Sequence, residues 1–391
     1  NMGDNSPEFQ IAMAPPFLSD SNGHFIFTTA NLQLLTGYAA NLVRYYNGTG
    51  FDWGGKHFQS ASTHHITWWA IYNEPNINNI TAAQYVQIYN ALVPAMLAVD
   101  PTLKFTALEL SGFSGEVQKF MPTLMLPSAS GGLSYPVGSI STHFYSGCNQ
   151  IYTDTKLFSY TAQFASDVTY MRTQLKTRTD LANTPIWVTE NNVNADYPLT
   201  TGFSSCNSGQ TFVNDPRGTS AFFAAWRPVI FSQLGKAGNQ GLYHFLYEGS
   251  SQYAEVNSGS AAKYLSYWVD YYLQRTFPWD GTSTGASILR TTTTETTPSV
   301  ELLAVRNADN SVSLLVADYA VHNAADNNGS GDPRTVIVDI SALGTFTSAS
   351  QITLDAATNL INGPTATALA LTPKLTLTLN GYGSTLISLK P

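Results

Sequence analysis

The stretch that decides the fold spans residues 65–76 and reads HITWWAIYNEPN. Its apolar, β-branched and aromatic run, residues 66–72, predicts a buried strand. The strand is expected to end there, because Pro75 cannot donate to a sheet ladder and favours an extended backbone at Glu74. A carboxyl group, with the amide of Asn73 beside it, is therefore expected at the C-terminal tip of the strand. In parallel α/β barrels this tip carries the catalytic side chains.

A second stretch repeats this arrangement. Residues 185–189 read PIWVT, end in Glu190 and lead into a polar loop at residues 191–194. Cleavage of a glycosidic bond needs one carboxyl group to protonate the leaving oxygen and another to meet the oxocarbenium-like centre. Either glutamate alone could be a salt-bridged carboxylate at a strand end. The pair, with Asn-Glu-Pro around Glu74, favours the catalytic interpretation.

With these two motifs the sequence resembles the retaining β-glycosidases of clan A, and glycoside hydrolase family 39 and its relatives in particular. Their signature is an Asn-Glu-Pro at the end of barrel strand four and a second Glu at the end of strand seven. The resemblance implies a (β/α)8 TIM barrel, with Glu74 as general acid/base and Glu190 as nucleophile. Asn73 matches the asparagine that hydrogen-bonds the sugar 2-hydroxyl. A β-xyloside is the family's best-known substrate, with uronosides, glucosides and galactosides as alternatives.

The resemblance also implies residues that support the glutamates and bind the sugar. In the clan, a Tyr or His at the end of strand six holds the nucleophile ionised. The strand that reads SISTHFY places His143 and Tyr145 on one face. Tyr145 is the preferred candidate, and a hydrogen-bonded core imidazole is the alternative for His143. Tyr247 is expected to form an aromatic platform after the last strand, Glu248 to contact substrate hydroxyls or lie in a solvated loop, and Trp279 to lie near the barrel mouth.

Strand-like and helix-like stretches alternate over residues 1–280, which predicts βα units around a parallel sheet. Six strands are expected, beginning near residues 9, 66, 104, 139, 185 and 241. A closed barrel needs eight strands, and the resemblance makes the Glu74 strand the fourth. The first two βα units are therefore expected to be absent from this chain, and a second polypeptide or an N-terminal fragment to complete the barrel. An open six-stranded sheet is the alternative.

The pattern changes over residues 281–391. Short alternating strands are separated there by turn signals such as Asn328-Gly329 and Asn380-Gly381. This pattern predicts an antiparallel β-sandwich as an accessory domain next to the catalytic barrel.

Composition limits the partners of the chain. Its net charge of -8 argues against nucleic acid or an anionic membrane as partner. No apolar run is long enough to span a bilayer. Aromatic residues make up 12% of the chain, a supply suited to stacking on sugars, although most of these rings are expected in the core. Carbohydrate is the partner that the resemblance implies. No cofactor is implied, and neither the two cysteines nor the histidine spacing predicts a metal site.

The cysteines bear on the compartment. In the barrel that the resemblance implies, Cys148 and Cys206 lie on loops after strands six and seven, so a disulfide between them is expected in an exported protein. A secreted or periplasmic location is therefore predicted. Two alternatives to a hydrolase remain open: a transglycosylase on the same scaffold, and a non-catalytic glycan-binding protein.

Overall fold

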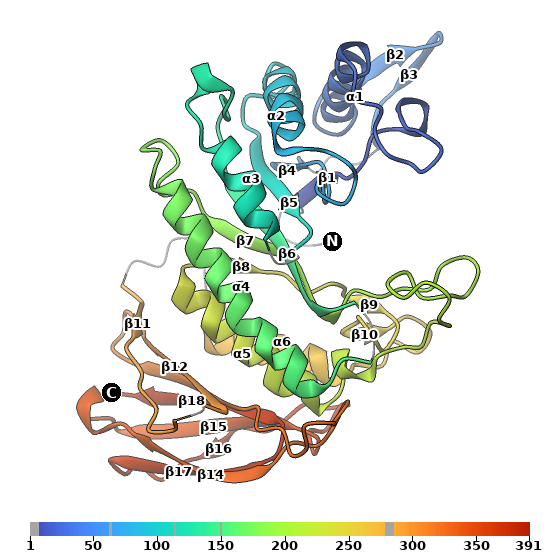
Figure 1. Cartoon of the computed structure of the whole chain (residues 1–391). Helices are drawn as coiled ribbons and strands as arrows, with labels where there is room; N and C mark the ends of the chain where they lie inside the picture. The colour runs from blue at the N-terminus through green and yellow to red at the C-terminus, as the bar shows by residue number, and fades with distance from the viewer. Residues whose placement is uncertain (1–7, 62–64, 113–114, 149–150, 278–284, 297) are drawn as a thin grey trace. The chain divides into compact units, whose positions relative to one another are not determined.

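The computed structural model describes residues 8–61, 65–112, 115–148, 151–277, 285–296 and 298–391 (Figure 1). The chain divides into two compact units, each of which is described by itself. The first unit comprises Asn1–Phe144, Ser166–Glu190 and Gly238–Tyr243, and the second comprises Tyr145–Ala165, Asn191–Ala237 and His244–Pro391.

A curled, six-stranded parallel sheet forms the centre of the first unit. Its strands lie in chain order, as successive βα units produce. All six begin near the predicted positions, so this part of the fold prediction is confirmed, whereas a closed eight-stranded barrel stays a prediction. The strands are β1 (Glu8–Ile11), β4 (Trp68–Ile71), β5 (Lys104–Leu110), β6 (Ser139–Gly147), β7 (Ile186–Asn194) and β8 (Gly241–Leu242). The last residues of β6 and β7 are counted with the second unit.

Helices follow the strands of this sheet. α1 (Thr29–Asn47), α2 (Ala82–Leu97) and α3 (Glu116–Leu124) lie side by side (Figure 1). α2 begins with a capping box, because Thr81 accepts a hydrogen bond from the amide of Gln84, whose side chain accepts one from the amide of Thr81. α4 (Asp154–Leu175) precedes β7, and its residues are divided between the two units.

The sequence analysis did not predict one hairpin of the first unit. β2 (Phe51–Trp53) pairs with β3 (Lys56–Phe58) around Gly54 and Gly55, both of which have positive φ. Two glycines of this conformation form the tight turn that best fits the twist of a hairpin.

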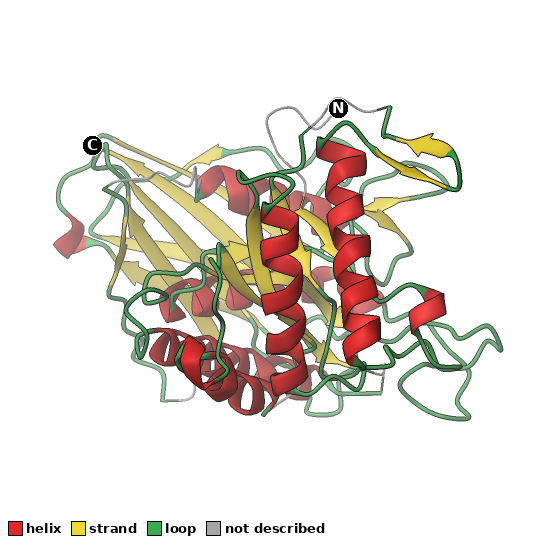
Figure 2. Ribbon diagram, turned by 90° about the horizontal axis from the view of Figure 1, so that it is seen from above, coloured by secondary structure: helices red, strands yellow, loops and turns green. Residues whose placement is uncertain are grey.

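The second unit contains two antiparallel sheets that share one hydrophobic core (Figures 1 and 2). Leu314 and Val316 of the larger sheet and Leu377 and Leu379 of the smaller sheet are all buried in it. Helices α5 (Ala221–Ala237) and α6 (Leu265–Thr276) pack against the larger sheet. In strand order, the larger sheet is β11 (Ser287–Leu289), β12 (Val300–Arg306), β13 (Val312–Asp318), β18 (Gly383–Lys390), β15 (Ser348–Asp355) and β16 (Thr367–Ala368), and the smaller is β14 (Pro333–Asp339) and β17 (Lys374–Asn380).

Two predicted strand ends are wrong. β7 does not stop at Glu190 but continues through Asn194. The polar side chains that follow Glu190 find hydrogen-bond partners within the protein; the side-chain Nδ2 of Asn192, for example, donates to the carbonyl of Tyr253. The last strand of the parallel sheet, predicted over residues 241–247, ends at Leu242. The amides of Tyr243 and Phe245 still donate to β7, at Val188 and Asn191, but the amide of Leu246 donates to Tyr253 in a loop.

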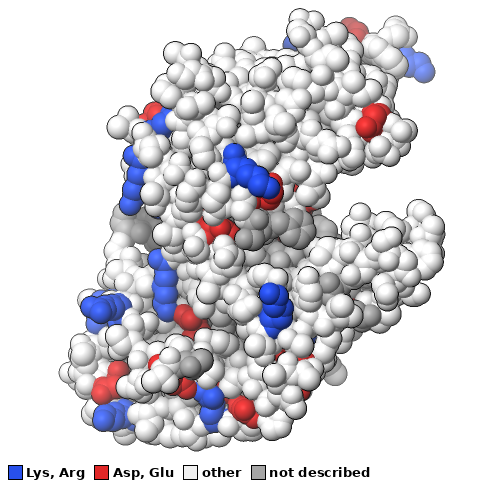
Figure 3. All heavy atoms as spheres, viewed as in Figure 1, with Lys and Arg blue, Asp and Glu red and all other residues white. Residues whose placement is uncertain are grey.

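The predicted disulfide between Cys148 and Cys206 is present, which suggests an oxidising compartment. Among the described residues, no helix combines the length and the apolar character needed to cross a membrane. On the face drawn in Figure 3, charged side chains are scattered among many uncharged ones, in keeping with a chain of which only 11% is charged.

Candidate active site

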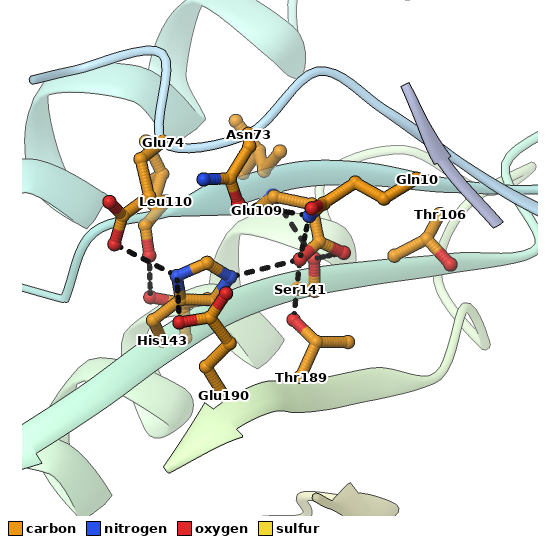
Figure 4. A network of polar contacts seen from close by, with 12 residues as sticks. Gln10, Asn73, Glu74, Thr106, Glu109, Leu110, Ser141, His143, Thr189 and Glu190 are labelled. Atoms are coloured by element: carbon orange, nitrogen blue, oxygen red, sulfur yellow. Dashed lines mark hydrogen bonds and ion pairs between the residues drawn. The ribbon is translucent and has the colours of Figure 1, made fainter. Parts of the chain in front are cut away.

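The loop after β4 directs Glu74 towards the neighbouring strands. Tyr72 (φ 69°) and Glu74 (φ 43°) adopt the left-handed conformation, which is uncommon for residues other than glycine. The amide of Glu74 donates to the carbonyl of Glu109 on β5 at 2.8 Å. The turn is therefore tied to the sheet, and the Glu74 carboxylate points to His143 of β6 (Figure 4).

Glu74 and Glu190 lie close together, as the sequence predicted for strand-end glutamates. One oxygen of each carboxylate lies within 4.8 Å of the other and of a ring nitrogen of His143. Their side chains are 19% and 23% exposed, respectively. Both carboxylates are therefore close enough to act on one small group and open enough for it to reach them.

His143 lies between these carboxylates and is completely buried. Its Nδ1 is 2.9 Å from Glu74 Oε1 and 3.5 Å from Glu190 Oε2, and its Nε2 is 3.0 Å from Glu109 Oε2. Burial lowers the pKa of His143, but hydrogen bonds with Glu109 and Glu74 and the nearby negative charges outweigh burial and raise the pKa to about 10. The ring is therefore an imidazolium at neutral pH, and both nitrogens donate.

Glu109 is a third carboxylate of the site, which the sequence analysis missed. It lies in the apolar strand β5 and is 1% exposed. Its presence in the run KFTALEL is the signal that could have revealed it, since an acidic side chain is almost never fully buried without a partner.

Glu8 of β1 is a further carboxyl group near this cluster. Burial and the charge of Glu109 raise the pKa of Glu8 to about 7, although a hydrogen bond from Thr106 and the charge of His143 lower it. Glu8 is therefore partly protonated at neutral pH, which limits the negative charge inside the sheet.

Gln10 of β1 fixes the predicted sugar-binding amide of Asn73. Its Nε2 donates to Asn73 Oδ1 at 2.9 Å and to Glu109 Oε2 at 3.3 Å. Because Asn73 uses its oxygen as acceptor, its Nδ2 is the end that can donate to a ligand beside Glu74 (Figure 4).

Four predicted site residues remain: Tyr145, Tyr247, Glu248 and Trp279. Tyr145 belongs to the second unit, where its ring lies 6.2 Å from that of Phe245. Tyr247 is 63% exposed, and Glu248 begins the two-residue strand β9 (Glu248–Gly249), which pairs with β10 (Val256–Asn257). Trp279 lies outside the described residues. Substrate-binding roles for these four residues stay predictions.

Two clusters of the described residues have the composition of a metal site. Glu74, His143 and Glu190 form one, in which Nδ1 of His143 lies 2.9 Å from Glu74 and Nε2 lies 3.0 Å from Glu109. The other, in the second unit, is His244, Glu255 and Asp270.

Arg227 pairs with Asp270 of the second cluster. Arg227 Nε donates to Asp270 at 2.7 Å, and His244 Nδ1 lies 2.7 Å from the same carboxylate. Burial and the charge of Asp270 raise the pKa of Glu255 to about 8, although the charge of Arg227 lowers it. The geometry of the second cluster is that of a partly buried ion-pair network.

Comparisons with known proteins connect this geometry to a fold. No protein-family model and no curated protein matches the chain. Among solved structures, a monomeric β-xylosidase from Caulobacter crescentus CB15 is similar, with 14% identity, 98% of this chain and 80% of that chain covered, and a TM-score of 0.62.

Two further structures give similar values. A GH51 α-L-arabinofuranosidase from Thermotoga petrophila RKU-1 has 15% identity, 90% and 73% coverage and a TM-score of 0.59. A GH39 β-xylosidase from Caulobacter crescentus has 15% identity, 98% and 79% coverage and a TM-score of 0.56. These structural neighbours are glycoside hydrolases of clan A, the group that the sequence resembles, and the chain shares their fold.

Proposed function

We propose that this chain is a retaining β-glycoside hydrolase, with Glu190 as nucleophile and Glu74 as general acid/base. The observation that carries the proposal is the approach of the two carboxylates to within 4.8 Å. Retaining glycosidases hold their carboxyl groups about 5–5.5 Å apart, whereas inverting enzymes separate them by roughly 6.5–9.5 Å to admit a water molecule.

In the first step, Glu190 attacks the anomeric carbon while Glu74 gives its proton to the leaving oxygen, so a glycosyl ester forms on Glu190 and the aglycone departs as an alcohol. In the second step, the Glu74 carboxylate takes a proton from water, and that water displaces the sugar from Glu190. The substrate class is a β-linked oligo- or polysaccharide, for which the β-xylosidases among the structural neighbours suggest β-xylosides as the first to test.

His143 has a role in both steps. Its Nδ1 lies within reach of both Glu74 and Glu190. While Glu74 holds the proton that it will donate, the imidazolium stabilises the Glu190 carboxylate. Once Glu190 is esterified and neutral, the same N–H stabilises the Glu74 carboxylate as a base. Asn73 Nδ2 donates to the sugar 2-hydroxyl at the face of the nucleophile.

The proposal extends to the rest of the protein. The six parallel strands belong to a catalytic domain, residues 1–280, which forms part of a (β/α)8 barrel. A second polypeptide or an N-terminal fragment would complete this barrel. The antiparallel sheets of residues 281–391 form a β-sandwich accessory domain. The disulfide and the likeness to glycosidases support secretion or export to a periplasm as the location.

Azide rescue of two variants tests the two roles. After a screen of aryl β-glycosides, Glu190→Ala should lose turnover, and azide should restore it with formation of the α-glycosyl azide. Glu74→Ala should spare substrates with good leaving groups far more than natural ones, because only the latter need protonation. Azide should then yield the β-glycosyl azide.

A matched control supports the interpretation. Glu116→Ala removes a half-buried glutamate at the start of α3 that pairs with the exposed Lys119 and should leave turnover unchanged. Full activity in Glu190→Ala would rule out the double-displacement mechanism, and so would release of the inverted anomer by the wild-type protein.

A further inference from the structure

The buried Glu109 carboxylate accepts hydrogen bonds from four side chains. Ser141 Oγ donates to its Oε1 at 2.7 Å, and Thr189 Oγ1 donates to its Oε2 at 2.6 Å. Gln10 and His143 also donate to Oε2. The donors come from three different strands, β1, β6 and β7, so the carboxylate is fixed from several sides (Figure 4).

The backbone around Glu109 departs from regular strand geometry. The pairing of β5 with β6 shifts register between Ala107 and Leu110. Within this bulge, Leu108 (φ 84°) and Glu109 (φ 49°) both adopt left-handed conformations. Bulges redirect a side chain and are frequent next to active sites, and strained backbone conformations cluster at such sites as well.

The backbone groups freed by the bulge have specific partners. The amide of Leu108 donates to the Tyr85 hydroxyl, and that of Glu109 to Ser141 Oγ. The carbonyl of Glu109 accepts the amide of Glu74. Glu109 therefore contacts the site twice, through its carboxylate to His143 and through its carbonyl to the backbone of the proposed acid/base.

We propose that Glu109 is a positioning residue, which keeps a proton on both ring nitrogens of His143 so that Nδ1 always donates towards Glu74 and Glu190. This inference rests on the proposed function for its effect on turnover. Its effect on the protonation of His143 is independent of any substrate.

The charges around His143 show why Glu109 decides its state. Glu8 of β1, Glu74 after β4, Glu109 of β5 and Glu190 of β7 all act on the imidazole. Glu74 and Glu190 change charge during the proposed reaction, whereas the Glu109 carboxylate, which is bonded to Ser141, Thr189 and His143, takes no part in either step. Without that charge, Nδ1 would become an acceptor whenever the ring lost a proton, and Glu190 would lose its donor.

The negative charge of Glu109 also acts on two phenols. Tyr85 of α2 and Tyr243, just after β8, both interact with its negative charge. Burial raises the pKa of both hydroxyls, so they stay neutral over the range in which His143 titrates, and the change in charge belongs to the histidine.

Glu109→Gln tests the proposal, because glutamine keeps the shape and an accepting oxygen but removes the charge. The alkaline limb of the kcat/KM profile should move to lower pH, with a loss of about tenfold or more near pH 8 that is partly recovered in acid. In ¹⁵N-histidine-labelled protein without substrate, the His143 signal, identified by its loss in His143→Asn, should change from imidazolium to neutral imidazole near that pH.

Two further variants make the result decisive. Glu109→Asp retains the charge with a shorter side chain, so it should lower turnover while His143 remains an imidazolium and the alkaline limb stays in place. Glu116→Gln removes a half-buried carboxylate of α3 that pairs with the exposed Lys119, and it should change neither readout. An unchanged imidazolium in Glu109→Gln would overturn the proposal even if the protein cleaves no sugar, and an inactive wild type with the expected NMR change would overturn only the proposed function.

Discussion

Raising the pH from neutral to alkaline values should destabilise the protein through His143. The pKa of this buried group is raised from 6.5 to about 10 by hydrogen bonds and charges from Glu109, Glu74 and Glu190, which outweigh burial. A folded-state pKa above the unfolded value means that the stabilisation is complete below about pH 6.5 and is lost as the pH rises through about 10. At about 1.4 kcal/mol for each pH unit between the two values, the loss is on the order of 5 kcal/mol.

The assay is urea unfolding, followed by tryptophan fluorescence, at a series of pH values from about 6.5 to about 10. Other groups titrate over this range, so the informative quantity is the difference between the wild type and His143→Gln, which should shrink as the pH rises. His57→Gln is the matched control, because His57 is exposed and pairs with Asp52 at the surface, and its free energy of unfolding should follow the wild type. A constant difference between the wild type and His143→Gln across the range would refute the buried imidazolium.

Two further predictions concern stability. Burial and the charge of Glu109 raise the pKa of Glu8 from 4.5 to about 7. Folding therefore favours the neutral form of Glu8, and the stability that this form contributes is lost as the pH rises through about 7. Glu8→Gln should raise the free energy of unfolding near pH 8 by about 1–3 kcal/mol and have little effect near pH 4. The disulfide closes a loop across a separation of 58 residues, so the double variant Cys148→Ser, Cys206→Ser should lose about 2–4 kcal/mol; equal urea midpoints for this variant and the oxidised wild type would contradict that expectation.

The pair of glutamates was predictable because their local sequences carry the signal. Asn73-Glu74-Pro75 ends one apolar run and Glu190 follows another, and a parallel sheet brings such positions to one edge. Because β5 and β6 lie between β4 and β7, the close approach of Glu74 and Glu190 also depends on the curl of the sheet. The close approach of His143 also follows from its place in the strand between them in chain order.

Glu109 was not predictable in the same way. Its role depends on a bulge and on donors from Gln10, Ser141 and Thr189, none of which is adjacent in sequence. Local patterns describe a regular strand there, and pairing between distant strands decides where the register shifts.

Strand ends show the same limit. The polar residues after Glu190 predict a loop, yet β7 continues because partners elsewhere in the chain satisfy Asn192 and Asn194. The hairpin of β2 and β3, by contrast, had a local signal in Gly54-Gly55, which a closer application of turn preferences would have found.

The bulge of β5 also has a consequence for protein engineering. Procedures that raise heat tolerance often favour sequences with an ideal backbone, and residues 108–109, with their left-handed conformations, are an obvious target for such idealisation. A regular strand there would relieve the strain but turn Glu109 away from the histidine and release the amide of Glu74. At these two residues, thermal stability and the proposed catalysis favour different backbone conformations. Stabilising substitutions should therefore be sought in the second unit.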